Sequence, residues 1–283
     1  MRLQEQGVPL SGSAELTARQ GPSFLSSVVN FIYKTLVITE LEARKLRHDP
    51  IELVTRVVQP ALWLLVFGQV FTRTRIIDTG NLRYLDFMAP GVLAQSSLFI
   101  AIFSGMSIIW ERDLGIVHKF LATPSPRTAL VLGKALSGGV RALPQAAMIY
   151  ALALVLGVKV AWNSLSLLGV LLAVLLAAAA FSSFSMIIAF IVKSRERFMG
   201  IGQVLTMPFF FASNAIYPIS IMPGWLKVIA HMNPLTYEVD ALRGLMLTSG
   251  PHTYPYALDF GVLAFATTVL VVIGGKLYPN VVS

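Results

Sequence analysis

The chain contains no cysteine, and few of its 283 residues carry a charge. Without thiols it forms no disulfides, no thiolate metal sites and no cysteine-based catalytic centre. Charged residues make up 13% of the sequence, against about 25% in a typical soluble domain. Hydrophobic residues make up 55%, and the mean hydropathy is +0.72. One soluble core cannot cover this much apolar surface, so the composition predicts an integral membrane protein.

The sequence also lacks the motifs of ATP hydrolysis and of metal binding. The segment VLGKAL contains Gly133 and Lys134, but Ala135 replaces the hydroxyl residue that would bind magnesium, and Thr128 replaces the first glycine of a phosphate-binding loop. We interpret the small residues of the LSGG run, 136–139, as a site of close helix packing. The four histidines have no metal-ligand spacing, so no metal site is predicted.

Six apolar segments predict the membrane fold. None shows the alternation of a β-strand, and main-chain polar groups in lipid must be paired within their own segment, so we expect an all-α integral membrane protein. The predicted spans are 54–71, 87–110, 131–157, 164–192, 198–221 and 257–277. Residues 1–22 are polar and are predicted to form a disordered cytoplasmic tail, and residues 23–283 to form one membrane domain.

The segment before the first span, residues 24–47, has a different character. Its apolar residues at helical spacing are Leu25, Val28, Val29, Ile32 and Leu36. The other faces are polar, and the segment ends in the charged run ELEARKLRHD. It is too polar to span, which predicts an amphipathic helix in the membrane interface. A soluble helix packed on a partner is the alternative.

The distribution of lysine and arginine predicts the orientation. Of the 22 such residues, 15 lie in the amino-terminal region, in the connections after spans two and four, and at the carboxyl end, and six lie in the other connections. The excess places both termini in the cytoplasm. The remaining residue, Arg141, lies inside the third span and is interpreted as reaching back to the inner interface. A pair with Glu111 and a role in substrate passage are the alternatives.

A charged stretch, ERDLGIVHKFLATPSPRTALVLGKA, separates the second and third spans and begins with Glu111 and Arg112. The apolar residues on or beside one helical face are Leu114, Val117, Phe120 and Leu121. Pro124 ends this helix, and Ser125–Pro126 begins the next. The pattern predicts a short cytoplasmic helix with an apolar face that docks on a partner. A solvated loop with its apolar residues packed under the bundle is the alternative.

The connection before the last span, Met222 to Leu247, is long and partly apolar. One helical stripe consists of Trp225, Leu226, Ile229 and Met232, and another of Leu235, Val239, Leu242 and Met246. Pro234 separates the two because it lacks an N–H and clashes with the preceding turn. We therefore predict two short amphipathic helices that dip into the outer interface.

Polar and aromatic residues in the second and fifth spans are candidates for contact with a transported molecule. They are Gln95, Ser97, Phe99 and Phe103 in one span, and Gln203, Thr206, Phe210 and Asn214 in the other. Aromatic and weakly polar walls suit amphipathic cargo. In the alternative, the aromatic rings pack helices and the hydroxyls bond to the backbone.

The order of these elements resembles the permease subunits of type-2 ABC exporters, especially the daunorubicin-resistance and multidrug branch. The segments that carry the resemblance are ERDLGIVHKFLATPSPRTALVLGKAL and NAIYPISIMPGWLKVIAHMNPLTYEVDALRGLM. In the second segment the matching residues are Asn214, Pro218, Pro223, Trp225, Asn233, Pro234, Leu235 and Arg243. The resemblance covers residues 24–278.

The resemblance implies a fold and a set of partners. The fold has an interfacial amino-terminal helix, six spans, a coupling helix at Glu111 to Ala122, and a re-entrant helical pair before the last span. Two separate ATPase subunits bind ATP and Mg²⁺, so this chain needs no cofactor of its own. A second permease copy completes a homodimer, and spans two and five border the substrate path between the copies.

The implied function is export of a hydrophobic or amphipathic small molecule across the plasma membrane of a prokaryote, and a lipid-linked glycan is the alternative cargo. A secondary transporter would show ionisable residues at mid-membrane or an internal inverted repeat. A membrane enzyme would need polar side chains that converge at one depth. The sequence shows neither pattern, and its net charge of +8 fits the orientation of the loops better than nucleic-acid binding.

The predicted orientation can be tested by cysteine labelling, because the chain has no cysteine of its own. An impermeant thiol reagent added outside intact cells should modify Gly80→Cys, which lies in an outer connection. It should modify Ser194→Cys only after the cytoplasmic face has been opened. The reverse pattern would overturn the topology.

Overall fold

The computed structural model describes residue 29 and residues 31–40, 50–74, 77, 79–80, 82–117, 126–192 and 194–281. Within these ranges the regular structure is helical, with one isolated β-bridge between Val160 and Leu247. The predicted all-α fold class is thereby confirmed for this part of the chain. The predicted tail 1–22 lies outside the described residues.

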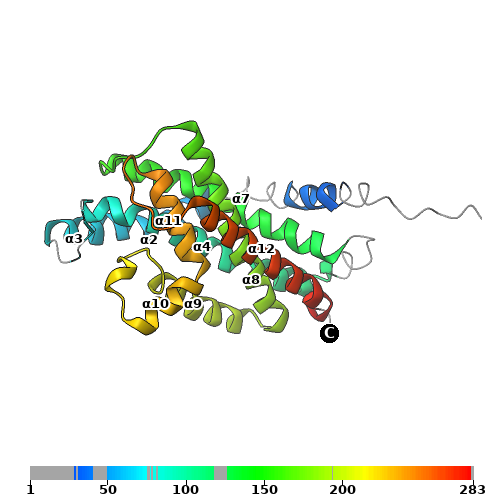
Figure 1. Cartoon of the computed structure of the whole chain (residues 1–283). Coiled ribbons are helices and arrows are strands. Elements are labelled where there is room, and N and C mark those ends of the chain that lie inside the picture. Colours follow the sequence, from blue (N-terminus) through cyan, green and yellow to red (C-terminus); the bar gives the residue numbers. More distant parts are fainter. Residues whose placement is uncertain are drawn as a thin grey trace, which may run out of the picture.

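Four helices within the described ranges are long and apolar enough to cross a membrane. They are Tyr84–Asp113, which consists of α4 (Tyr84–Ser104) and α5 (Met106–Asp113), and α7 (Arg127–Val155), α8 (Ser164–Ile191) and α12 (Tyr256–Leu277). They match the second, third, fourth and sixth predicted spans to within a few residues. Figure 1 shows α4, α8 and α12 crossing the centre of the bundle, with α7 beside them.

Helix α4 forms the centre of the bundle, and small residues bring its neighbours close together. Most α4 side chains are buried, and α7, α8 and α11 (Pro234–Met246) pack around it. In α7, Gly138 contacts Ser182 of α8, where a Cβ atom would overlap the serine hydroxyl. A Cβ on Gly139 would lie 2.7 Å from a methyl group of Leu175. The predicted packing role of the LSGG run is therefore confirmed.

The first predicted span, 54–71, lies within a continuous helical stretch. It consists of α2 (Pro50–Leu62), the π-helical η1 (Trp63–Gly68) and α3 (Gln69–Thr74). Pro60 lies inside α2, three residues before the π-helical turn. The missing proline N–H leaves the carbonyl of Arg56 without its helical partner, and Gln145 of α7 donates to this carbonyl instead, at 3.1 Å. A wider turn nearby is a common response to such a break.

In the fifth predicted span, 198–221, the helix covers only the first part. Helix α9 is Arg195–Phe211, and the chain is not helical again until the 3₁₀ turn η2 (Ile219–Ile221). The apolar residues after Phe211 extend the hydropathy signal, but the backbone leaves the helix soon after Pro208. Side chains from elsewhere in the fold bind the carbonyls that this early end exposes, as described below.

The two helices predicted on either side of Pro234 are confirmed. They are α10 (Gly224–Met232) and α11, with Asn233 as the single residue between them. Asn233 caps α11 by accepting the N–H of Leu235 at 3.0 Å, and Pro234 occupies the first turn, where its missing N–H costs nothing. Helix α11 packs against α4, α8 and α12, whereas α10 lies near the edge of the bundle (Figure 1).

The described part of the amino-terminal segment, residues 31–40, is helical. Thr35 and Ile38 are buried, and Thr39 donates a hydrogen bond of 3.1 Å to the carbonyl of Gly133 in α7. Its apolar side chains Ile32 and Leu36 are about half exposed, with 51% and 57% of their surface uncovered. This arrangement suits a helix with one side on the bundle and one in lipid.

Candidate functional site

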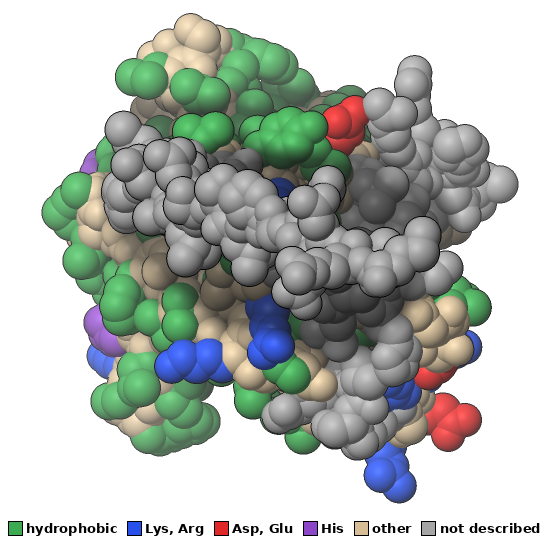
Figure 2. Space-filling model, turned by 90° about the vertical axis from the view of Figure 1, so that its right-hand side faces the viewer, with side chains coloured by type: hydrophobic (Ala, Val, Ile, Leu, Met, Phe, Trp, Pro, Cys, Tyr) green, Lys and Arg blue, Asp and Glu red, His purple; other side chains and the backbone are tan. Residues whose placement is uncertain are grey.

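The charged stretch between the second and third spans begins inside a helix. Glu111 and Arg112 belong to α5, which ends at Asp113. A turn follows at Leu114 and Gly115, whose φ of 69° lies in the left-handed region that favours glycine. Figure 2 faces this end of the bundle and shows charged side chains among the apolar ones, as expected where helices leave the membrane.

A buried ion pair attaches the end of α5 to α7. The Lys134 ammonium lies 2.6 Å from both carboxylate oxygens of Glu111, and these side chains are only 4% and 8% exposed. A buried charge is stable only when it is paired and hydrogen-bonded, and each of these residues provides the other with an opposite charge. The sequence prediction considered Arg141 as a partner of Glu111, whereas this contact comes from Lys134.

Two residues of the predicted apolar face of the coupling helix differ in their exposure to solvent. Leu114 is 69% exposed, whereas Val117 is completely buried in a cluster that includes Ile108 of α5 and Phe198 of α9. Leu114 lies in the turn that follows α5, so the helical periodicity that groups it with Val117 does not hold at this point. Phe120 and Leu121 lie outside the described residues.

A cavity of about 310 Å³ lies between α2, α4 and α7. Its lining consists of Thr55, Arg56, Gln59, Pro60, Gln95, Ser96, Phe99, Ile100, Phe103 and Gln145. Three predicted substrate-path residues, Gln95, Phe99 and Phe103, therefore share one wall, as their spacing of four on α4 requires. The Phe99 and Phe103 rings are stacked with their centres 6.3 Å apart.

The amide groups of Gln95 and Gln145 line this cavity and are buried. Gln95 is 2% exposed, and neither its Oε1 nor its Nε2 has a hydrogen-bond partner among the described residues. Gln145 donates from Nε2 to the carbonyl of Arg56 at 3.1 Å, while its Oε1 has no partner in the same part of the chain. Buried amides without partners are costly, so donors and acceptors on a bound molecule would be favoured here.

The other predicted substrate-path residues do not line this cavity within one copy of the chain. Ser97 donates a 2.6 Å hydrogen bond to Glu238 of α11. Thr206 is buried and donates to the carbonyl of Gly202 within α9. Phe210 packs edge-on against Trp63. Gln203 is exposed on the outer face of α9.

The carbonyls at the end of α9 and just after it are bound by buried side chains. Asn233 donates from Nδ2 to the carbonyls of Phe209, at 2.7 Å, and Ala212, at 2.8 Å. Arg243 is 2% exposed and donates to the carbonyl of Asn214 at 2.6 Å. Its guanidinium carbon lies 3.9 Å from the centre of the Phe87 ring in α4. Asn233 and Arg243, which the resemblance picks out, thus act through their side chains, whereas Asn214 takes part through its main-chain carbonyl.

The proline and tryptophan positions of this region act at element boundaries. Pro218 immediately precedes η2, and Pro223 immediately precedes α10, where each fixes φ and needs no hydrogen bond. Trp225 is 68% exposed on α10. An exposed tryptophan beside apolar residues suits the boundary between membrane and water.

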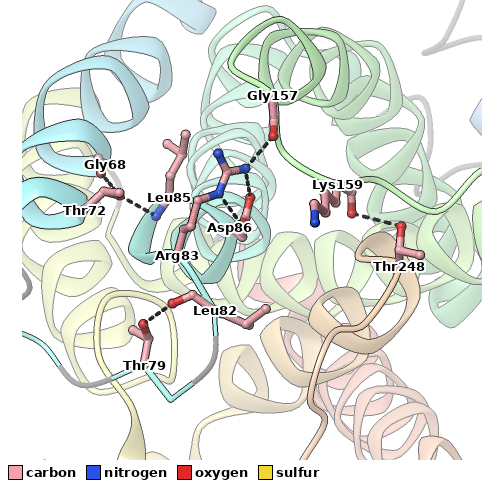
Figure 3. A network of polar contacts seen from close by, with 10 residues as sticks. All are labelled: Gly68, Thr72, Thr79, Leu82, Arg83, Leu85, Asp86, Gly157, Lys159 and Thr248. Atoms are coloured by element: carbon pink, nitrogen blue, oxygen red, sulfur yellow. Dashed lines mark hydrogen bonds and ion pairs between the residues drawn. The ribbon is translucent and has the colours of Figure 1, made fainter.

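Hydrogen bonds hold together the loops at the predicted outer end of the bundle (Figure 3). Arg83 donates twice to Asp86, at 2.8 Å each, and also to the carbonyl of Gly157. The hydrogen bond to the Asp86 carboxylate raises the pKa of Arg83, which therefore stays charged. Thr248 donates to the carbonyl of Lys159 at 3.3 Å. The ends of α4, α7 and α11 thus form one ordered surface.

The long apolar helices, with their buried polar contacts, define a multi-pass membrane protein. Comparison with known proteins shows the class. The model of the ABC-2 type transporter family matches residues 33–247, and the chain belongs to this family. It is thus a membrane permease, a transport subunit that lacks an ATPase domain.

Individual relatives agree with the family. The protein is 29% identical over 226 residues to ycf38 of Cyanophora paradoxa, which is named as a transport permease, covering 78% of this chain and 77% of the relative. It is 25% identical over 247 residues to the daunorubicin resistance ABC transporter permease protein DrrB1 of Streptomyces coeruleorubidus, covering 86% and 84%. It is 23% identical over 212 residues to the inner membrane transport permease YadH of Escherichia coli K12, covering 75% and 80%.

Removal of one partner of the buried ion pair should destabilise the fold strongly. Lys134→Met leaves Glu111 without the ammonium that neutralises it, and such changes cost about 3–5 kcal/mol. Thermal unfolding of the protein in detergent, followed by intrinsic tryptophan fluorescence, should show a much lower midpoint. The double variant Glu111→Leu/Lys134→Met should recover most of the loss, because no buried charge then remains.

Lys159→Met is the matched control, because Lys159 is an exposed lysine in the connection between α7 and α8. Exposed substitutions of this kind change stability by about 0.5 kcal/mol or less. If Lys134→Met unfolds at the same temperature as Lys159→Met, the ion pair does not anchor α5 to α7.

Proposed function

We propose that the chain is the permease subunit of an ATP-driven exporter of hydrophobic or amphipathic small molecules. The observation that carries this proposal is the cavity between α2, α4 and α7, in which aromatic walls meet the amide of Gln95 and the Oε1 of Gln145, atoms that have no hydrogen-bond partner among the described residues. Such a lining suits a molecule with an apolar body and an uncharged polar group. The relative DrrB1, whose name refers to daunorubicin resistance, supports the same class of cargo.

Energy for transport is assigned to separate ATPase subunits, two in each complex, that bind ATP and Mg²⁺. The family to which the chain belongs is the basis for this assignment, together with the broken phosphate-binding pattern around Gly133. Their docking site is the coupling segment, residues 111–122, of which 111–117 are described. Leu114 supports this site, because an apolar side chain that is 69% exposed at the water interface favours a partner.

The complete membrane domain, residues 23–283, is proposed to cross the plasma membrane of a prokaryote six times, with both termini in the cytoplasm. The stretch α2–α3 and helix α9 supply the two crossings beyond the four long helices. Helices α10 and α11 form a re-entrant pair at the outer side. The count of lysine and arginine residues supports this orientation.

A second copy of the chain is proposed to pack against α9 in a homodimer. The exposed face of this helix carries Val204, Met199 and Phe211, which are 70%, 53% and 43% exposed. Gln203 is exposed beside them, and a polar amide is disfavoured against lipid. Contact between two copies would cover the apolar residues and pair the amide.

Substitution within the cavity should change the affinity for cargo without affecting assembly. Gln95→Leu keeps the volume but removes the amide, and loss of one or two hydrogen bonds of about 0.5–1.5 kcal/mol each predicts a roughly tenfold higher half-saturating concentration. The half-saturating concentration is measured from the uptake of fluorescent amphipathic compounds into inside-out vesicles. Ser183→Ala, a buried change in α8 away from the cavity, is the control. Unchanged concentration dependence in both Gln95→Leu and Phe99→Ala would exclude the cavity as the cargo site.

A charge on the docking face should release the ATPase. Leu114 is exposed, so Leu114→Glu should insert and fold normally, while loss of a buried leucine contact, worth about 1.5–3 kcal/mol, weakens docking at least tenfold. Leu114→Met keeps the contact and is the control. Phe120→Glu should act in the same way as Leu114→Glu. Full recovery of ATPase with both glutamate variants, in pull-downs from native membranes, would show that the segment is only a loop.

A further inference from the structure

The first residue of α9, Arg195, contacts the end of α5. Its Nη2 and Nε atoms lie 2.7 and 3.1 Å from Oδ2 of Asp113, and its guanidinium carbon lies 4.4 Å from the centre of the Trp110 ring. Arg112 also donates to the other carboxylate oxygen of Asp113, at 3.1 Å. We call the set Trp110, Asp113 and Arg195 the α5–α9 contact.

The α5–α9 contact differs in kind from the buried Glu111–Lys134 pair. Arg195 and Asp113 have 44% and 37% of their side-chain surface exposed, so water can replace either partner at little cost. The Glu111–Lys134 pair is almost completely buried, so its separation would cost much more than that of the exposed pair. Helix α5 therefore has a buried ion pair with α7 and an exposed, easily separated one with α9, beside the apolar cluster that Ile108 shares with Phe198.

Helix α9 also lies beside the cavity wall. A Cβ atom on Gly202 would lie 3.3 Å from Ile102 and 3.9 Å from Phe103 of α4. Phe103 lines the cavity, and the exposed face of α9 is the proposed dimer face. A shift of α9 relative to α4 would therefore alter both the cavity and the contact between copies.

We propose that Arg195 is a positioning residue that makes α9 follow the coupling segment. When the ATPase displaces the end of α5, the α5–α9 contact transmits the movement to α9, while Glu111–Lys134 keeps α5 and α7 together. This inference rests on the proposed function, because it requires an ATPase docked at the coupling segment. It assigns to Arg195 a part in transport and none in ATPase binding.

The test compares Arg195→Ala with Arg197→Ala in purified complexes reconstituted into vesicles. Both changes remove one exposed positive charge near the start of α9. For Arg195→Ala we expect normal ATPase recovery and normal ATP hydrolysis, with about two- to fivefold less cargo moved per ATP, the range that loss of one exposed ion pair allows. Arg197→Ala should match the unmodified protein in all three measurements.

A charge swap separates transmission from general damage. Asp113→Arg alone should lower the cargo moved per ATP, and Asp113→Arg/Arg195→Asp should restore at least part of it, because the ion pair is formed again. Equal transport by Arg195→Ala and Arg197→Ala overturns the inference, and so does a double variant no better than either single one. If the unmodified chain recovers no ATPase at all, the proposed function fails instead, which is a different result.

Discussion

The structure depends on one constraint: a main-chain N–H or carbonyl in hydrocarbon must have a partner, because no water is available there. Long helices such as α8 and α12 meet this requirement internally. Helix α9 does not continue, and its last carbonyls would be left unpaired. The amide of Asn233 and the guanidinium of Arg243 bind the carbonyls of Phe209, Ala212 and Asn214 instead. Polar residues in α11 and before it are thus the reason that irregular backbone is possible beside α4.

The same scarcity of water makes the few charged contacts informative. Glu111 and Lys134 are buried together and hold two helices in a fixed relation, while Asp113 and Arg195 meet at the surface and are easily separated. One end of α5 therefore carries a firm attachment and a reversible one within three residues. A transporter whose helices are moved by a partner at one end needs both kinds of attachment, since some helices must move together and others must separate.

Sequence patterns predicted what depends on local composition. The long apolar runs located α4–α5, α7, α8 and α12 within a few residues, and Pro234 located the boundary between α10 and α11. The end of α9 was missed, because hydropathy counts apolar side chains and does not register where the backbone stops pairing with itself. Gln95, Phe99 and Phe103 were predicted from their residue types to contact a transported molecule, and in the structure their spacing of four places them on one wall of the cavity.

Contacts between distant segments could not be predicted in this way. Lys134 was counted as a loop charge, and nothing in the sequence identified Glu111, 23 residues earlier, as its partner. Periodicity grouped Leu114 with Val117 but could not tell that Val117 faces the core and Leu114 faces outward. Gln145 and Gln59 line the cavity beside Gln95, yet they lie on different helices and only the fold brings them together.

The central claim is that a separate ATPase drives this permease. The most direct measurement isolates the chain from its native membranes in a mild detergent, identifies the bound proteins by mass, and follows cargo uptake after reconstitution with and without ATP. We expect a polypeptide with a complete phosphate-binding loop, in equal amount to the permease, and uptake that requires ATP. A permease that is recovered alone and moves its cargo with an ion gradient, without nucleotide, would contradict the claim.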